Sequence, residues 1–247
     1  MENIKRVALI TGSTSGIGEG IAKLLIENGF IVALHSHKSI EKGEALAKEL
    51  ENASYTQADL SQHENIPIFI EEIIYKHGRI DVLINNAGIS EVIPHNELKK
   101  ATADIWNKLH NVNVIAPWLL ITELEDSLRK SATKEQPSCI INITSHAGVR
   151  AKGASIPYAV SKAALNHMTK ILAVTLGNNI RVNAIAPGLV DTPMTKSWKW
   201  AHEIWENNAP MARAAQPLDI AQVALMLINS DYLTGEVIIV DGGLNLV

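Results

Sequence analysis

Short apolar runs alternate with amphipathic stretches along nearly the whole chain, and this alternation limits the possible folds more than any other feature. The apolar runs are predicted strands and lie at residues 7–10, 31–34, 80–84, 139–144, 180–185 and 236–240. The stretches between them have apolar residues at helical spacing and lie at residues 17–28, 40–50, 101–130, 158–176 and 216–229. Continuous apolar strands separated by helices are typical of a parallel sheet covered on both faces. We therefore predict an α/β fold whose parallel sheet has about seven strands.

The chain shows no sign of division into smaller domains. Its 247 residues fit one α/β domain, and it contains neither an internal repeat nor a linker rich in Pro, Gly or Ser. A hydrophobic fraction of 47% with 19% charged residues is ordinary for a globular protein with a large core. We predict a single domain over residues 1–247.

Charge and apolar content exclude several classes of partner. A net charge of −4 argues against a nucleic-acid-binding protein. No apolar run approaches the roughly 18 residues that a membrane-spanning helix needs, and no signal-peptide-like segment precedes the first strand. Cys139 is the sole cysteine and lies in an apolar run, which favours a core residue and a reducing environment. We therefore expect a cytoplasmic protein that binds neither membranes nor nucleic acid.

A glycine-rich segment joins the first predicted strand to the first predicted helix. It reads Thr11-Gly-Ser-Thr-Ser-Gly-Ile-Gly18. Glycines at this place let the backbone turn tightly and bring a pyrophosphate close to the helix N-terminus. The strand–turn–helix context therefore predicts a dinucleotide-binding, Rossmann-type doubly wound fold.

Tyr158 and Lys162 form a candidate acid–base pair. If Tyr158 begins a helix, Lys162 lies one turn further along the same face. An ammonium group beside a phenol favours the phenolate and so lowers the pKa of the tyrosine, which makes it usable as a proton donor and acceptor near neutral pH. The hydroxyl of Ser145 could hold a substrate oxygen at the same spot. A surface helix with an exposed lysine is the alternative at this point.

Taken in order, these motifs resemble those of the short-chain dehydrogenase/reductase family in its compact form. The glycines are spaced GxxxGxG, Asn85-Asn-Ala-Gly88 follows the strand at 80–84, and four further residues come in the family's order: Asn113, Ser145, Tyr158 and Lys162. The resemblance extends to Pro187-Gly188, Thr192 and Asp241-Gly-Gly243, and so covers nearly the whole chain. The motifs look most like those of 3-oxoacyl-carrier-protein reductases.

This resemblance implies four catalytic roles. Tyr158 would be the general acid in reduction and the general base in oxidation, and Lys162 would lower its pKa and hold the nicotinamide ribose. Ser145 would bind the substrate carbonyl as the hydride arrives from the cofactor. Asn113 would support a water that relays protons to Lys162. The implied reaction interconverts a small-molecule carbonyl compound and a secondary alcohol.

The resemblance also implies which residues contact a nicotinamide cofactor. They come from the glycine-rich segment, from the ends of later strands and from the catalytic pair: Gly12, Ser13, Ser15, Gly16, Ile17, Gly18, Ser36, His37, Lys38, Asp59, Leu60, Asn86, Ala87, Gly88, Tyr158, Lys162, Pro187, Gly188, Val190 and Thr192. Ser36 stands where NAD-specific members carry Asp, so no carboxylate repels a 2′-phosphate there, and Lys38 adds a cation. We therefore favour NADP(H) over NAD(H), although Ser15 replaces the basic residue that NADP-dependent members often have in the loop.

The segment 191–213 contains Trp198, Trp200 and Trp205, three of the five tryptophans. The resemblance implies that this segment is a flexible lid over the substrate. Aromatic side chains in a lid favour an apolar or ring-bearing substrate. Packing of the lid onto the protein body, or a subunit contact, is equally compatible with three tryptophans.

Other functions remain open at this point. The glycine-rich segment also resembles that of NAD-dependent 3-hydroxybutyrate dehydrogenases, and a non-catalytic nucleotide-binding regulatory protein could share the fold. His35 and His37 lack a third ligand nearby, so we predict no metal site and assign both histidines to a loop. Family members usually form dimers or tetramers, so the resemblance implies a homo-oligomer, with a homotetramer as the expected form.

Overall fold

The computed structural model describes residues 5–247, and a seven-stranded parallel sheet runs through it. The strands are β1 (Val7–Ile10), β2 (Ile31–Ser36), β3 (Ala53–Gln57), β4 (Val82–Asn85), β5 (Ser138–Ile143), β6 (Ile180–Pro187) and β7 (Val237–Val240). They lie in the order β3-β2-β1-β4-β5-β6-β7, and each neighbouring pair is parallel. The order reverses between β1 and β4, which places a crevice at their carboxyl ends. The predicted Rossmann-type α/β fold is confirmed.

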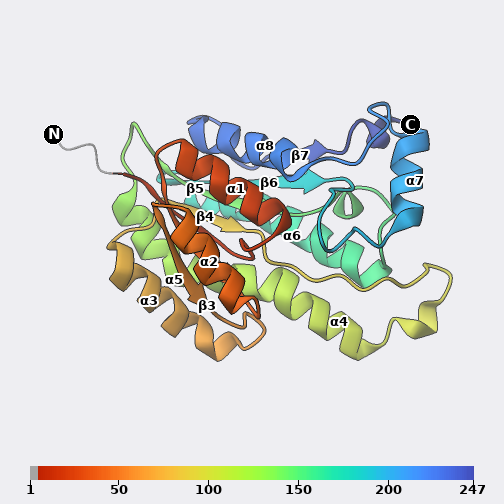
Figure 1. Cartoon of the computed structure of the whole chain (residues 1–247), viewed down its shortest axis with the longest axis horizontal. Coiled ribbons are helices and arrows are strands. Elements are labelled where there is room, and N and C mark those ends of the chain that lie inside the picture. Colours follow the sequence, from red (N-terminus) through yellow and green to blue (C-terminus); the bar gives the residue numbers. More distant parts are fainter. Residues whose placement is uncertain (1–4) are drawn as a thin grey trace.

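Helices cover both faces of the sheet (Figure 1). One face carries α1 (Gly16–Glu27), α2 (Ile40–Glu49) and α8 (Pro217–Asn229). The opposite face carries α3 (Ile66–His77), α5 (Ala116–Ser131) and α6 (Ile156–Leu176). Two further helices, α4 (Ala103–His110) and α7 (Lys199–Asn208), lie at the right-hand end of the molecule in Figure 1.

Each face of the sheet has its own hydrophobic core. In β1, Val7 and Leu9 join the core beneath α3, α5 and α6, whereas Ala8 and Ile10 join the core beneath α1 and α8. This alternation follows from the two-residue period of a strand, so a strand buried on both faces must be apolar at every position. Cys139 is fully buried in the second core, where burial raises the pKa of its thiol.

Four elements differ from the sequence expectation. The edge strand β3 and the helices α3 and α7 were not among the predicted runs. β3 lacks a continuous apolar run because it carries polar side chains at Ser54 and Thr56 and borders only one neighbouring strand. The predicted helix at 101–130 is divided into α4, a π-helical turn at Asn111–Ile115 and α5. A π-turn inserts one extra residue into a helix and so redirects the side chains that follow it.

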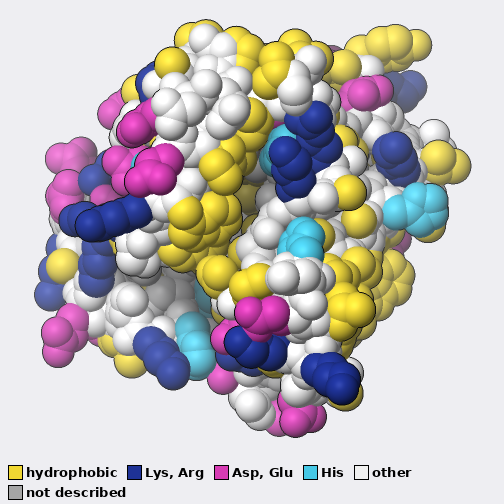
Figure 2. Space-filling view, turned by 90° about the vertical axis from the view of Figure 1, so that its right-hand side faces the viewer, with side chains coloured by type: hydrophobic (Ala, Val, Ile, Leu, Met, Phe, Trp, Pro, Cys, Tyr) yellow, Lys and Arg dark blue, Asp and Glu magenta, His cyan; other side chains and the backbone are white. Residues whose placement is uncertain are grey.

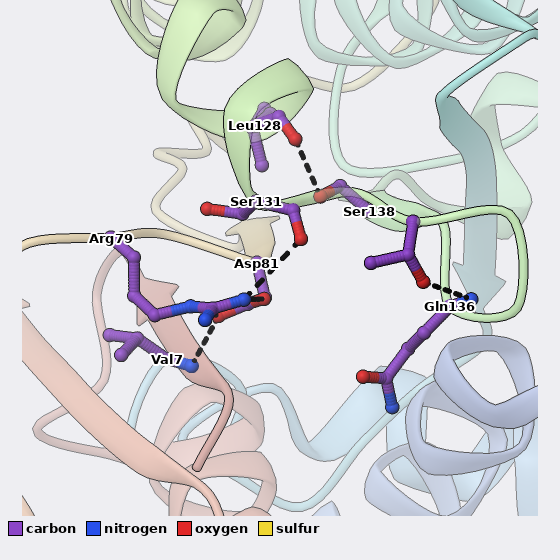
Figure 3. A network of polar contacts seen from close by, with 8 residues as sticks. Val7, Arg79, Asp81, Leu128, Ser131, Gln136 and Ser138 are labelled. Carbon is purple, nitrogen blue, oxygen red and sulfur yellow. Dashed lines mark hydrogen bonds and ion pairs between the residues drawn. The ribbon is translucent and has the colours of Figure 1, made fainter. Parts of the chain in front are cut away.

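A polar network links the amino ends of the strands, at the edge of the sheet opposite the crevice (Figure 3). The carboxylate of Asp81 accepts hydrogen bonds from the backbone N–H of Val7 at 2.8 Å and from Arg79 Nε at 3.0 Å. Arg79 also donates to the carbonyl oxygen of Ser131 at 3.3 Å. Nearby, the hydroxyl of Ser138 donates to the carbonyl oxygen of Leu128 at 2.8 Å. The start of β1, the start of β5 and the end of α5 are therefore tied to one another.

Across residues 5–247, none of the helices combines the length and the apolar character that crossing a bilayer requires.

Candidate active site

The carboxyl ends of the strands open into a cavity of about 790 Å³. Its wall begins at the glycine-rich segment, passes the ends of β2, β4, β5 and β6, and finishes at the segment 191–213, which we call the lid. Figure 2 shows this end of the molecule hollowed, with hydrophobic side chains gathered along the hollow and Lys, Arg and His side chains beside it. The volume lies within the range that cofactors and small substrates occupy.

The glycine-rich segment has the backbone that a close-bound pyrophosphate needs. Gly12 and Gly16 adopt φ values of +64° and +55°, which side chains disfavour. A Cβ added at Gly18 would lie 2.5 Å from the carbonyl oxygen of Gly12, so only glycine fits this packing. Gly16 and Ile17 begin α1 and line the cavity, so the positive end of the helix dipole faces it.

His35 fixes this segment to β2. Its Nδ1 accepts a hydrogen bond from the N–H of Gly12 at 3.1 Å, and its Nε2 lies 3.0 Å from the carbonyl oxygen of Ala58. Its backbone N–H donates to the hydroxyl of Ser13 at 2.9 Å. Burial lowers the pKa of His35 to about 4, which keeps the ring neutral, with its proton on Nε2. The expectation that His35 is a loop residue is wrong, because it belongs to β2.

Thr11 and Asn86 hold the glycine-rich segment from the other side of the crevice. The hydroxyl of Thr11 accepts hydrogen bonds from the N–H groups of Asn86 and Ala87, both at 3.0 Å. The side-chain amide of Asn86 donates to the carbonyl oxygens of Thr11 at 2.8 Å and Gly12 at 3.0 Å. The ends of β1 and β4 therefore hold the segment rigidly at the sheet's reversal point.

The end of β2 combines a hydroxyl with two basic side chains. Ser36 is buried, and its hydroxyl lies 2.8 Å from that of Tyr55. His37 and Lys38 are exposed at the cavity wall, and His37 Nε2 lies 3.1 Å from a carboxylate oxygen of Asp59. Partial burial would raise the pKa of Asp59, but hydrogen bonds from Ser61 and the nearby His37 and Lys38 together lower it.

Ser145 and Tyr158 come together on the cavity wall from two different elements. Ser145 follows β5 and caps a short 3₁₀ turn, where its hydroxyl accepts from the N–H of Ala147 at 3.1 Å. Tyr158 lies in the first turn of α6, which Ser155 caps by accepting from the N–H of Tyr158 at 3.3 Å. Burial raises the pKa of Tyr158, and a hydrogen bond with Ser145 offsets part of that rise.

Lys162 lies one helical turn beyond Tyr158, as the spacing predicts. Its Nζ is 6.0 Å from the centre of the Tyr158 ring and donates to the carbonyl oxygen of Ile143 at 2.9 Å. Burial lowers the pKa of Lys162 to about 8. The expected lowering of the Tyr158 pKa by this lysine is not found, because the ammonium group is directed to the carbonyl and burial dominates. A Cβ added at Gly88 would lie 3.3 Å from Nζ, so glycine leaves room for the ammonium group.

The π-turn between α4 and α5 positions Asn113. This side chain is fully buried, accepts from the N–H of Ile89 at 2.9 Å and donates to the carbonyl oxygen of Ile89 at 3.0 Å. It also donates to the hydroxyl of Ser161, the neighbour of Lys162, at 3.1 Å. Asn113 therefore connects the π-turn to the segment after β4 and to α6.

Both ends of the lid are held together at its base. Val190 pairs with Ala215 in an isolated bridge, and the N–H of Asp191 donates to the carbonyl oxygen of Ala215 at 2.8 Å. Thr192 approaches the glycine-rich segment, since a Cβ added at Gly16 would lie 3.0 Å from its methyl group. All three lid tryptophans line the cavity.

Most of the residues predicted to contact a cofactor line this single cavity. Ser13 and Gly18 lie behind its wall, where they shape the glycine-rich segment, and Asn113 lies behind Lys162. Thr11, His35 and Ser155 are supporting residues that the sequence reasoning missed. Of these, only Ser155 has a local signal, since a serine before Pro157 marks a helix start. Within residues 5–247, no cluster of at least three His, Cys, Asp or Glu side chains could hold a metal ion.

Comparisons with known proteins place the chain among the reductases. The family described as enoyl-(acyl carrier protein) reductase matches residues 12–245. The chain is 39% identical to a protein of Streptomyces violaceoruber that is named granaticin polyketide synthase putative ketoacyl reductase 2. The alignment covers 97% of this chain and 96% of that protein.

Solved structures agree over almost the full length. The Pseudomonas aeruginosa RhlG complex with NADP has a TM-score of 0.90 at 34% identity, with 97% of this chain and 96% of that chain covered. The 3-ketoacyl-(acyl-carrier-protein) reductase of Brucella melitensis, solved with NADH, has a TM-score of 0.88 at 30% identity, with 98% and 99% covered. Short-chain dehydrogenases/reductases are among the other structures that match. With the glycine-rich crevice and the Ser–Tyr–Lys geometry, these matches show that the chain is an oxidoreductase of the short-chain dehydrogenase/reductase family.

Proposed function

We propose that this protein is an NADPH-dependent reductase that converts a carbonyl compound of the 3-oxoacyl type into the secondary alcohol. The observation that carries this proposal is the position of Tyr158, Lys162 and Ser145, which all line the cavity that the glycine-rich segment also lines. The 3-oxoacyl specificity is supported by the names of the relatives, several of which are 3-oxoacyl-carrier-protein or ketoacyl reductases.

The cavity's residues fit a nicotinamide dinucleotide, which supplies the hydride when it is bound. Gly12 and Gly16 leave the backbone open for a pyrophosphate, and Gly88 leaves space beside Lys162 for a ribose. Val190 and Thr192, at the start of the lid, would hold the nicotinamide amide. These positions lie along one continuous wall.

The protein's own residues then manage the proton. Ser145 and Tyr158 donate hydrogen bonds to the carbonyl oxygen, where negative charge develops as the hydride arrives. Tyr158 transfers its proton to that oxygen and acts as general base in the reverse direction. Because burial lowers the pKa of Lys162 to about 8, this side chain can gain and lose a proton close to physiological pH, which suits it to restore the proton of Tyr158. Asn113 holds the helix segment that carries Lys162 in place.

The preference for NADPH over NADH rests on the end of β2. Lys38 lies at the cavity wall and forms no ion pair with any residue in the range 5–247. Asp59 is the one carboxylate among the described residues that line the cavity, and one of its oxygens lies 3.1 Å from His37 Nε2. The NADP complex of RhlG supports this choice, whereas the NADH complex of the Brucella melitensis reductase keeps the NAD-dependent alternative open.

Steady-state kinetics with both cofactors test this preference. We expect kcat/KM to be at least about tenfold higher with NADPH than with NADH, since a charge-assisted contact contributes about 1.5–3 kcal/mol. Lys38→Ala should lower kcat/KM for NADPH and leave that for NADH nearly unchanged. Lys42→Ala is the matched control, because Lys42 pairs with Glu19 and does not line the cavity. Equal rates with the two cofactors would contradict the assignment.

A non-catalytic nucleotide-binding protein is the alternative of another class. Acetoacetyl thioesters and simple ketones, offered with NADPH, separate the two functions. Consumption of NADPH supports the reductase. Tight NADPH binding, followed by fluorescence, without turnover of any ketone would favour the alternative.

We also infer that the protein self-associates, with a tetramer as the expected form. The outer face of α6 exposes Val160, Ile171 and Val174, and the last is 86% exposed. The edge strand β7 is likewise only half-buried. Light scattering measures the mass directly, and Val174→Glu should reduce it if α6 forms the contact. A cytoplasmic location and a lid function for residues 191–213 stay predictions, the former testable by cell fractionation.

A further inference from the structure

The lid consists of two halves that differ in how they are held. In the second half, Trp205 Nε1 donates to the carbonyl oxygen of Asp241 at 3.2 Å, and its ring packs edge-on against His146 with 5.9 Å between ring centres. A Cβ added at Gly188 would lie 2.9 Å from the same indole. The N–H of Met211 also donates to the carbonyl oxygen of Gly242 at 3.1 Å. Trp205 therefore anchors the lid to the protein body.

The first half of the lid presents two indoles to the cavity. Trp198 and Trp200 stack with their ring centres 6.3 Å apart and their planes inclined by only 16°. Both line the cavity, and Trp200 is 47% exposed. Neither indole N–H donates a hydrogen bond to another residue of the described chain, so the hydrogen bond that fixes Trp205 has no counterpart in this pair. The two rings are stacked and nearly parallel, so the pair offers a flat indole face beside the cavity, which we call the Trp198–Trp200 surface.

The surroundings of this surface are apolar and carry no negative charge. Apolar residues among the rest of the lining include Ala147, Ala154, Leu189, Met194, Ile204 and Leu244, and Lys152 lines the cavity as well. Asp59 is the one carboxylate among the described lining residues, and it lies at the opposite, cofactor end. A flexible alkyl chain is accommodated by any apolar wall, whereas paired planar rings favour a planar partner through offset stacking.

We propose that the substrate carries a flat ring system that lies against the Trp198–Trp200 surface while its ketone reaches Tyr158 and Ser145. This proposal rests on the proposed reductase function and names the class of ketone that the site selects. Trp205 holds the lid, and Trp198 with Trp200 determines specificity.

Two ketones with the same number of carbon atoms provide the test: β-tetralone, in which the ketone lies in a fused ring system, and the open-chain methyl octyl ketone. We expect the native enzyme to have the higher kcat/KM for β-tetralone. Trp198→Leu and Trp200→Leu should each lower the ratio of the two kcat/KM values about fivefold. Trp200→Phe keeps a ring and should retain most of the ratio. Trp118→Leu is the matched control, because Trp118 is 43% exposed on α5 and does not line the cavity.

Binding of the alcohol β-tetralol in the presence of NADP⁺, measured by calorimetry, gives a readout that does not depend on turnover. Weaker tetralol binding in the two leucine variants supports the stacking surface, even if no ketone is reduced and the reductase function itself fails. An unchanged ratio in the leucine variants, with ketones still reduced, overturns the stacking surface and leaves the reductase function intact. Undetectable tetralol binding by the native enzyme also overturns it.

Discussion

Single residues of the site work because burial sets their protonation states. The pKa of Lys162 is lowered to about 8 and that of His35 to about 4, in each case because the charged form loses its hydration. Lys162 can therefore exchange a proton near neutral pH, whereas His35 stays neutral and keeps a lone pair directed at the N–H of Gly12. In the proposed mechanism Lys162 serves proton transfer, whereas His35 supports the shape of the glycine-rich segment.

Replacing Tyr158 with Phe removes the proposed proton donor and little else. We expect kcat to fall by a factor of at least about 100, because a positioned general acid contributes about that much or more. The dissociation constant for NADPH, measured by fluorescence titration, should change less than threefold. Near-normal turnover in Tyr158→Phe would assign the proton transfer to another group.

Replacing His35 with Leu tests how the glycine-rich segment is held. The folded pKa of about 4 lies below the usual 6.5, so the unfolded chain takes up a proton that the folded chain excludes. His35 therefore contributes stability that is present above about pH 6.5 and is lost as the pH falls toward 4, with a slope of up to about 1.4 kcal/mol per pH unit. Urea unfolding at several pH values should therefore show that the free energy of unfolding of His35→Leu depends less steeply on pH than that of the native protein.

The same variant should bind NADPH about tenfold more weakly, because the N–H of Gly12 loses its acceptor. His77→Leu is a suitable control, since burial lowers the pKa of His77 as well but its Nε2 contacts Ser54, away from the cavity. If His35→Leu and His77→Leu affect NADPH binding equally, His35 has no special role in the segment.

The start points of the secondary-structure elements determine where the side chains of the site lie relative to one another. The serine cap and Pro157 start α6 so that Tyr158 lies in its first turn, and one turn later Lys162 points back toward the end of β5. The π-turn then places Asn113 against the neighbour of Lys162. Small changes in where these elements start would move the reactive atoms relative to one another.

The anchored half of the lid leads to a prediction about local stability. Trp205→Leu removes the hydrogen bond to Asp241 and the contact with Gly188, so the lid should open more often while the sheet stays intact. Trypsin can cut after Lys196 and Lys199, and we expect cleavage there to become about tenfold faster. Trp118→Leu should leave the cleavage rate unchanged. A clearly lower melting temperature accompanying the faster cleavage would indicate global rather than local unfolding.

At the scale of elements, the sequence predicted what depends on local periodicity. The buried strands were predicted from continuous apolar runs, and the glycine-rich segment from its place between a strand and a helix. β3 did not, since its polar residues reflect a position at the sheet edge that only the assembled fold defines. The π-turn, the partner of His35 and the lower-than-usual pKa of Lys162 all depend on contacts between distant segments. The lowered pKa expected for Tyr158 failed for the same reason, because the orientation of Lys162 is set by Ile143.

In the whole molecule, the candidate active site and the Arg79–Asp81 network lie at opposite ends of the strands. The carboxyl ends of the strands carry the cavity, and the amino ends carry the Arg79–Asp81 network. Asp81→Asn should therefore lower the free energy of unfolding by about 2 kcal/mol, because a charged acceptor for Val7 and Arg79 is lost. Its KM for NADPH should stay within twofold of the native value. A large change in KM would mean that the two ends of the sheet are coupled.

The bridge between Val190 and Ala215 has a consequence for how such proteins diverge. After β6 the chain turns away at Val190 and comes back beside it at Ala215, just before α8, so the residues between them form a nearly closed excursion. Insertions, deletions or wholesale exchange of that excursion need not alter any strand pairing. A relative's segment of different length could be transplanted at these two positions, and substrate choice would travel with it while the hydride-transfer machinery stayed in place.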